Sequence, residues 1–92
     1  MLALCGAIAA RRVVVFAYKG AERRVEPHIV GVDASGMVLL EAWQLSGGSG
    51  ADWRNFHVGE MGAVAVLDSE IAEARSGYNP ASGRYARILC CV

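Results

Sequence analysis

From Val13 onward the chain is a series of short β-branched and aromatic segments separated by turns. Val13–Tyr18 ("VVVFAY") is followed by a short turn, and Arg23–Val32 ("RRVEPHIVGV") then alternates in polarity. Such runs are typical of strands, because successive side chains of a strand point to opposite faces of a sheet. Similar segments predict three further strands at Met37–Gln44, Trp53–Val58 and Gly62–Asp68. The sequence therefore predicts an antiparallel meander of five strands.

Five short, twisted strands in a small domain tend to close into a barrel, which removes exposed edges. We therefore predict a mainly β fold, a small five-stranded antiparallel SH3-like or Sm-like barrel over about residues 12–68. An alanine-rich start that ends at Arg11 and Arg12 predicts a short amphipathic N-terminal helix. Residues 69–92 are expected to form a C-terminal extension, with a helical turn at Ser69–Arg75 and a last strand at Arg84–Val92. With 92 residues the chain allows one core, hence a single domain over residues 1–92.

The charge balance excludes a strong field over the whole molecule, because nine basic residues face nine acidic ones. Anion binding would have to come from local clustering, for which arginine is better suited than lysine. No apolar stretch approaches the roughly 20 residues of a membrane span, and the start lacks the pattern of a signal peptide. The odd count of three cysteines suits a reducing compartment, so we expect a cytoplasmic protein. A zinc site that combines these cysteines with a histidine is disfavoured, because the spacings match no recurring ligand pattern; no metal or cofactor is expected.

Strand alternation separates an inward from an outward face. In the second strand the more apolar face carries Arg23, Val25, Pro27 and Ile29. In the third strand Glu41 argues for an outward face, which puts Val38, Leu40 and Ala42 inward and leaves an apolar outer stripe of Met37, Leu39 and Trp43. That stripe needs a cover, which the N-terminal helix, the C-terminal segment or a second subunit could supply.

The stretch Ala51–Val58 ("ADWRNFHV") concentrates large side chains. In this fourth strand Arg54, Phe56 and Val58 are expected to point inward, and Trp53, Asn55 and His57 outward. Antiparallel order then places five residues at one rim of the barrel: Tyr18, Arg23, Trp43, Trp53 and Arg54.

At that rim Arg23 and Arg54, two strands apart, would lie roughly 10 Å from each other, a span that phosphates could bridge. The candidate ligand-binding residues are therefore Tyr18, Arg23, Trp43, Trp53, Arg54 and His57. The alternative is structural. The tryptophans would only cover apolar surface, the arginines would pair with Glu22, Glu26, Asp52 or Glu60, and His28 and His57 would be ordinary surface histidines.

The order of these residues resembles the WYL domain, a small Sm-like or SH3-like barrel often attached to bacterial helix-turn-helix transcription regulators. The family pattern places a tyrosine near the end of the first strand, Arg-x-Val-x-Pro in the second, and Arg-x-Phe in the fourth. The matching positions are Tyr18; Arg23, Val25 and Pro27; and Arg54 and Phe56. The similarity extends over about residues 4–67.

Two departures bear on what the resemblance implies. The tripeptide that names the family is Val38–Leu40 ("VLL") here, and the family's late basic residue is Glu60. A carboxylate in that place removes a phosphate contact. The chain also carries no helix-turn-helix, so a separate helix-turn-helix regulator is the partner that the resemblance implies.

Two functional hypotheses follow. The resemblance implies a non-catalytic sensing or regulatory module that binds nucleotides or short single-stranded nucleic acid, which aromatic stacking beside cations would hold. The alternative is a self-associating barrel with no small ligand, whose contact is formed by Met37, Leu39, Trp43 and the C-terminal "ILCCV"; a homo-oligomer is expected in either case. No nucleophile turn, phosphate loop or carboxylate pair is present, so we expect no enzyme.

Overall fold

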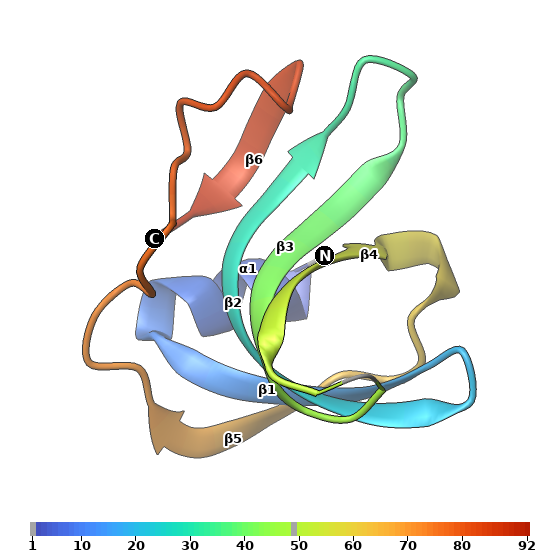
Figure 1. Cartoon of the computed structure of the whole chain (residues 1–92), viewed down its shortest axis with the longest axis vertical. Helices are drawn as coiled ribbons and strands as arrows, with labels where there is room; N and C mark the ends of the chain where they lie inside the picture. The colour runs from blue at the N-terminus through green and yellow to red at the C-terminus, as the bar shows by residue number, and fades with distance from the viewer. Residues whose placement is uncertain (1, 49) are drawn as a thin grey trace.

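A computed structural model of the chain describes residues 2–48 and 50–92. A first helix precedes a series of strands (Figure 1). In chain order the elements are α1 (Leu2–Ala10), β1 (Arg12–Tyr18), β2 (Ala21–Val32), β3 (Val38–Ser46), β4 (Asp52–His57), the 3₁₀ turn η1 (Val58–Glu60), β5 (Ala65–Glu70) and β6 (Arg87–Cys91). The predicted N-terminal helix and all five predicted strands are therefore present. No helix among the described residues is long and apolar enough to cross a membrane.

The sheet is antiparallel and open, so the predicted closed barrel is wrong. Its strand order is β4-β3-β2-β1-β5, with β6 paired to β2 outside this path. The sheet stays open because the two halves of the long strand β2 pair with different strands. A bulge between Pro27 and Ile29 interrupts it, its first half pairs with β1, and its second half pairs with β6. Figure 1 shows β1 and β5 crossing one end of β2 and β3 while β6 lies beside the other end.

The main core lies between α1 and the inner face of the sheet. Phe16, Tyr18 and Phe56 meet edge to face there, with the Phe16 and Phe56 ring centroids 5.0 Å apart and those of Tyr18 and Phe56 4.9 Å apart. Around them lie Leu4, Ala7, Ile8, Val14, Val25, Val30, Leu40 and Ala42. The helix is not amphipathic as predicted, because its exposed positions carry Ala3, Gly6, Ala9 and Ala10 rather than polar residues.

The strand pairing confirms most of the predicted faces. Leu40 pairs with Phe56 on the inner face, and Trp43 pairs with Trp53 on the outer face. Ile29 is the exception. After the bulge it pairs with Glu41, on the face opposite to Val25, although it remains fully buried. The outer face is therefore more apolar than the sequence pattern indicates.

The predicted helical turn at Ser69–Arg75 is wrong. Arg12 pairs with Glu70, so β5 extends to that residue, and the chain then continues without helix or strand until β6. We call residues 71–86 the strap. Its Ile71 is buried, and the Ile71 N–H donates to the Arg11 carbonyl over 2.7 Å. The strap crosses the outer face of the sheet and covers Trp43 of the outer stripe, whereas Met37 stays exposed.

A disulfide joins the two ends of the described chain. Cys5 in α1 is bonded to Cys90 in β6, a sequence separation of 85, and Cys91 remains free and exposed. The odd cysteine count therefore reflects one pair and one free thiol. The cytoplasmic prediction loses the support that it took from this count, because disulfides are rare in reducing compartments.

Candidate binding site on the strapped face

The six residues predicted to share a rim are divided between the two faces of the sheet. Tyr18, Arg23 and Arg54 belong to the inner face. The outer face carries Trp43, Trp53 and His57. Arg54 pairs with Ala42, which pairs with Pro27, four residues beyond Arg23 along β2. The two arginines are therefore offset along the strands and do not form the pair of phosphate contacts that the sequence suggested.

Arg23 binds the protein itself. Its Nε and Nη2 donate to the Tyr18 carbonyl over 3.3 and 3.2 Å, and its Nη1 donates to Gln44 Oε1 over 3.0 Å. Its guanidinium also lies 5.7 Å from the Tyr18 ring centroid. The Tyr18 ring is buried, and its hydroxyl accepts the His57 backbone N–H over 3.0 Å. This half of the predicted rim therefore stabilises the fold.

The glycine-rich connection after β3 is organised by the same network. Gln44 is fully buried, and its Nε2 donates to the carbonyls of Gly47 and Gly50 over 2.7 and 2.6 Å. A side chain on Gly48 would collide with the Arg23 guanidinium. The glycines thus let the loop close over Arg23, and the segment is not the loose connection that its composition suggests; Ser49 lies outside the described residues.

Arg54 contacts two neighbouring residues of β4. Its Nη1 lies 3.3 Å from Asp52 Oδ2 and donates to the Trp53 carbonyl over 3.0 Å. Asp52 is one of the carboxylates that the structural alternative predicts as a partner of the arginines. The pair is half exposed, which limits its contribution to stability.

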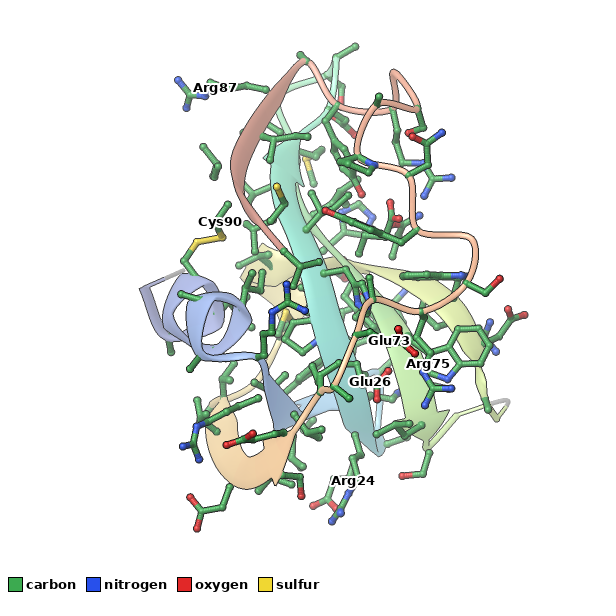
Figure 2. All side chains as sticks on the ribbon, turned by 90° about the vertical axis from the view of Figure 1, so that its left-hand side faces the viewer. Arg24, Glu26, Glu73, Arg75, Arg87 and Cys90 are labelled. Carbon is green, nitrogen blue, oxygen red and sulfur yellow. A yellow bond between two sulfur atoms is a disulfide. The ribbon has the colours of Figure 1, made fainter. Side chains whose placement is uncertain are left out.

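On the outer face four side chains converge on residues 75 and 76 of the strap. The Arg75 Nε donates to Glu26 Oε1 over 2.6 Å, and its Nη2 donates to Glu26 Oε2 over 3.3 Å. Figure 2 shows these two side chains turned toward each other. The guanidinium lies 5.2 Å from the Trp43 ring centroid, and the neighbouring Trp53 donates its indole N–H to the Ser76 carbonyl over 3.0 Å. The carboxylate is nearly buried, which makes this a charge-assisted, forked pair rather than a surface contact.

His28 completes this site and is fully buried, so its prediction as a surface histidine was wrong. The Arg75 backbone N–H donates to His28 Nε2 over 3.1 Å, which leaves the ring proton on Nδ1, 2.8 Å from the Glu26 carbonyl. The ring lies between Trp53 and Tyr78, at centroid distances of 4.9 and 5.3 Å. Burial lowers the pKa of His28, although the nearby Glu26 carbonyl and carboxylate act in the opposite direction. We call Glu26, His28, Trp43 and Trp53 the arginine seat.

The rest of the strap is held by two tyrosines. Tyr78 donates its hydroxyl to the Val92 carbonyl over 2.9 Å, and burial, followed by a hydrogen bond with Cys91, raises its pKa to about 12. Tyr85 donates to Glu41 Oε1 over 2.7 Å, and burial together with this hydrogen bond raises its pKa above the ordinary value. Arg84 adds an ion pair with the same carboxylate. These contacts hold the part of the strap that follows Arg75.

A pocket of about 370 Å³ lies beside the seat. It is lined by Glu26, Glu70, Ile71, Ala72, Glu73, Ala74, Arg75 and Ser76. Three of these residues are acidic and one is basic, so the pocket repels phosphate. Among residues 2–48 and 50–92, no three metal-binding side chains are placed to hold a metal ion.

His57 lies outside the seat. It pairs with Leu39 across β3 and β4, and its Nδ1 is buried without a hydrogen-bond partner among the described residues. Sequence reasoning therefore found two members of the seat, Trp43 and Trp53, and missed Glu26 and His28. The outward position of Glu26 opposite Trp43 was a usable signal for Glu26. Nothing in the sequence indicated Arg75.

Comparisons with protein-family models, with curated proteins and with solved structures found no match. The WYL resemblance therefore depends on Tyr18, the Arg-x-Val-x-Pro segment and the Arg-x-Phe segment. In this structure Arg23 and Tyr18 bind each other, and Phe56 packs against Tyr18. These residues, which match the family pattern, thus stabilise the core and its edge.

Proposed function

We propose that this chain is a non-catalytic binding module whose ligand surface is the arginine seat and the pocket beside it. The observation that carries this proposal is the convergence of one carboxylate, one buried histidine acceptor, one indole donor and one indole face on two residues of an irregular segment. A fold needs no such specific set to cover an apolar stripe. Binding sites, in contrast, are built from a few well-placed polar groups among aromatic side chains.

The rim predicted from the sequence serves less well as a ligand surface. Tyr18 is buried, and the guanidinium of Arg23 is committed to a carbonyl and to Gln44. A ligand there would have to replace these hydrogen bonds. On the strapped face, displacement of the strap alone would expose the seat.

The location of the surface can be tested with probes of different chemistry. We would titrate ¹⁵N-labelled protein with ATP, with short oligo-dT and oligo-rU, and with N-acetyl-arginine methylamide. The proposal expects that any probe that binds shifts the indole N–H of Trp53 and the amide of Arg75 first. Shifts centred on Arg23 and Arg54, or no shift with any probe, would contradict it.

Nucleotides or short single-stranded nucleic acid are a second ligand class, favoured by the WYL resemblance and by the paired indoles. Trp43 and Trp53 meet edge to face at 5.8 Å and remain partly exposed, and the Arg75 side chain over the Trp43 ring is 43% exposed. Bases could stack on these rings. Tryptophan quenching by oligo-dT that weakens with added salt, and that Arg75→Ala reduces, is the expected result for this class. Salt-independent quenching would exclude it. A regulatory output would then come from a separate helix-turn-helix partner.

A further inference from the structure

We infer that the arginine seat recognises an arginine-bearing peptide of a partner protein, and that Arg75 of the strap is a resident occupant which such a peptide displaces. This inference rests on the proposed function, because it names the ligand of the same surface. Its ligand is a segment with the pattern Arg-x-Gly that makes the same turn as Arg75–Tyr78, in which the Tyr78 N–H donates to the Arg75 carbonyl over 3.1 Å.

The side chain of the ligand is defined by the partners of Arg75. The two oxygens of Glu26 match the fork of a guanidinium, and the Trp43 ring covers its face. Planar, forked recognition with an aromatic cover selects arginine over lysine, whose ammonium is a compact point charge. Phosphate is disfavoured at the same place, because Glu26 is joined by Glu70 and Glu73 of the pocket.

The main chain of the ligand is recognised as well. His28 Nε2 accepts the N–H of the arginine, and the Trp53 indole N–H donates to the carbonyl of the next residue. A buried acceptor and a donor at successive main-chain groups fit a peptide and have no counterpart in a nucleotide backbone, which lacks N–H donors. These contacts therefore favour a peptide over a nucleic acid.

Gly77 accounts for the third position of the pattern. Its φ is +91°, and a Cβ there would lie 3.0 Å from Trp53 Nε1. A larger residue would strain the backbone and press on the indole that donates to Ser76. A ligand that follows the same path therefore needs glycine two residues after its arginine.

The segment around Arg75 is held in a way that lets a peptide replace it. Residues 72–77 are all exposed and belong to no helix or strand, so no ladder of backbone hydrogen bonds must be broken. Ile71 and the Tyr78 hydroxyl hold the chain on either side of residues 72–77, and one turn hydrogen bond joins the Tyr78 N–H to the Arg75 carbonyl. Because β5 and β6 flank the strap and β6 is bonded through Cys90, the strap of a second copy could not enter without unpairing both strands. The peptide of a different protein is therefore the expected competitor.

The test uses the chain's own segment as the probe. We would measure the affinity of an acetylated, amidated peptide with the sequence of residues 72–79 (AEARSGYN) for the full chain and for Arg75→Ala, following the Trp53 indole N–H. Arg75→Ala should bind it at least about tenfold more tightly, because its guanidinium no longer competes. Peptides with alanine in place of the arginine or the glycine should bind about tenfold to a hundredfold more weakly.

A second variant separates charge from shape. Glu26→Gln combined with Arg75→Ala keeps the volume of the site but removes the carboxylate, and it should lose the preference for the arginine peptide. Equal binding by the full chain and Arg75→Ala, equal binding of the alanine peptides, or an Arg75→Ala chain that no longer folds would each overturn the inference. The last result would show that Arg75 is a fixed structural residue. If the full chain instead binds oligo-dT, Arg75→Ala weakens that binding and neither chain binds the peptide, the ligand is a nucleic acid, and the proposed location survives.

Discussion

His28 shows how strongly single residues are committed in this small fold. Its ring is fully buried and has both nitrogens engaged with main-chain groups, so the folded protein favours its neutral form. The pKa of His28 in the folded chain is lowered from the ordinary 6.5 by burial. As the pH falls below 6.5, the unfolded chain binds a proton at this residue before the folded chain does. The stability that His28 contributes is therefore complete above that pH and is lost below it.

We accordingly predict that the free energy of unfolding decreases as the pH is lowered from about 7.5 to about 5, as measured by urea denaturation at each pH. His28→Gln removes the titrating group and should show a smaller fall over this range. An NMR titration that finds His28 protonated at or above its ordinary pKa would contradict this prediction.

Gly47 and Gly50 offer a matched pair of substitutions in one loop. Both have φ +101°, but a Cβ on Gly47 would collide with the Glu22 carbonyl, whereas none of the described atoms lies within 4 Å of a Cβ on Gly50. Both alanine variants carry the same backbone strain. We predict that Gly47→Ala lowers the free energy of unfolding by about 1–3 kcal/mol more than Gly50→Ala does. Equal losses in urea denaturation would show that the collision is relieved at no cost.

At the scale of elements, the Cys5–Cys90 disulfide fastens α1 to β6. A crosslink between positions so far apart in the chain restricts the unfolded state strongly. Reduction, or Cys90→Ser, is expected to cost about 2–5 kcal/mol of stability and to raise hydrogen exchange in β6 first. Cys91→Ser, which changes only the free thiol, serves as the control and should retain full stability. A denaturation midpoint that a reductant leaves unchanged in the unmodified chain would contradict the prediction.

Elements with a clear period were predictable, and those defined by distant pairing were not. Alternation in β3 and β4 identified the faces of Leu40, Phe56, Trp43 and Trp53, because both strands are regular. The bulge at Pro27–Ile29 moves Ile29 to the face opposite to that predicted, and no local sequence pattern predicted the bulge. The strap has no period at all, since its position follows from hydrogen bonds to residues some fifty positions earlier, such as Arg75 to His28.

The candidate site was predictable in part for the same reason. Aromatic and cationic side chains are the distinctive feature of "ADWRNFHV", and its Trp53 lies in the seat beside Trp43 of β3. The cation that joins them is Arg75 rather than Arg23 or Arg54. Arginine residues are common along the chain, so which one reaches the indoles depends on the path of the strap.

At the scale of the whole molecule, part of the surface predicted for self-association is covered. Leu39 is buried and Trp43 lies under Arg75, whereas Met37 of the same stripe stays exposed; Met37 and Val66 are the exposed large apolar residues among those described, each at 46%. Val66 belongs to β5, which ends the strand order opposite β4. Terminal strands with open edges can pair between copies.

We therefore propose that any homo-oligomer forms through the edge of β5, and predict that Val66→Lys shifts it toward the monomer in sedimentation velocity at high protein concentration. Met37→Lys, which places the same charge on the β2–β3 turn, is the control and should leave the distribution unchanged. Dissociation by Met37→Lys alone would place the contact at that turn instead.

The central claim is that the strap closes the arginine seat but is not a permanent part of the fold, and native-state hydrogen exchange tests it most directly. The Arg75 amide, bonded to His28, should be protected, yet it should exchange by an opening that costs less free energy than that of the Leu40 amide at the centre of β3. Exchange of the two amides with the same free energy would mean that the strap leaves only when the whole protein unfolds. An unprotected Arg75 amide would mean that the seat is not closed, and either result would contradict the claim.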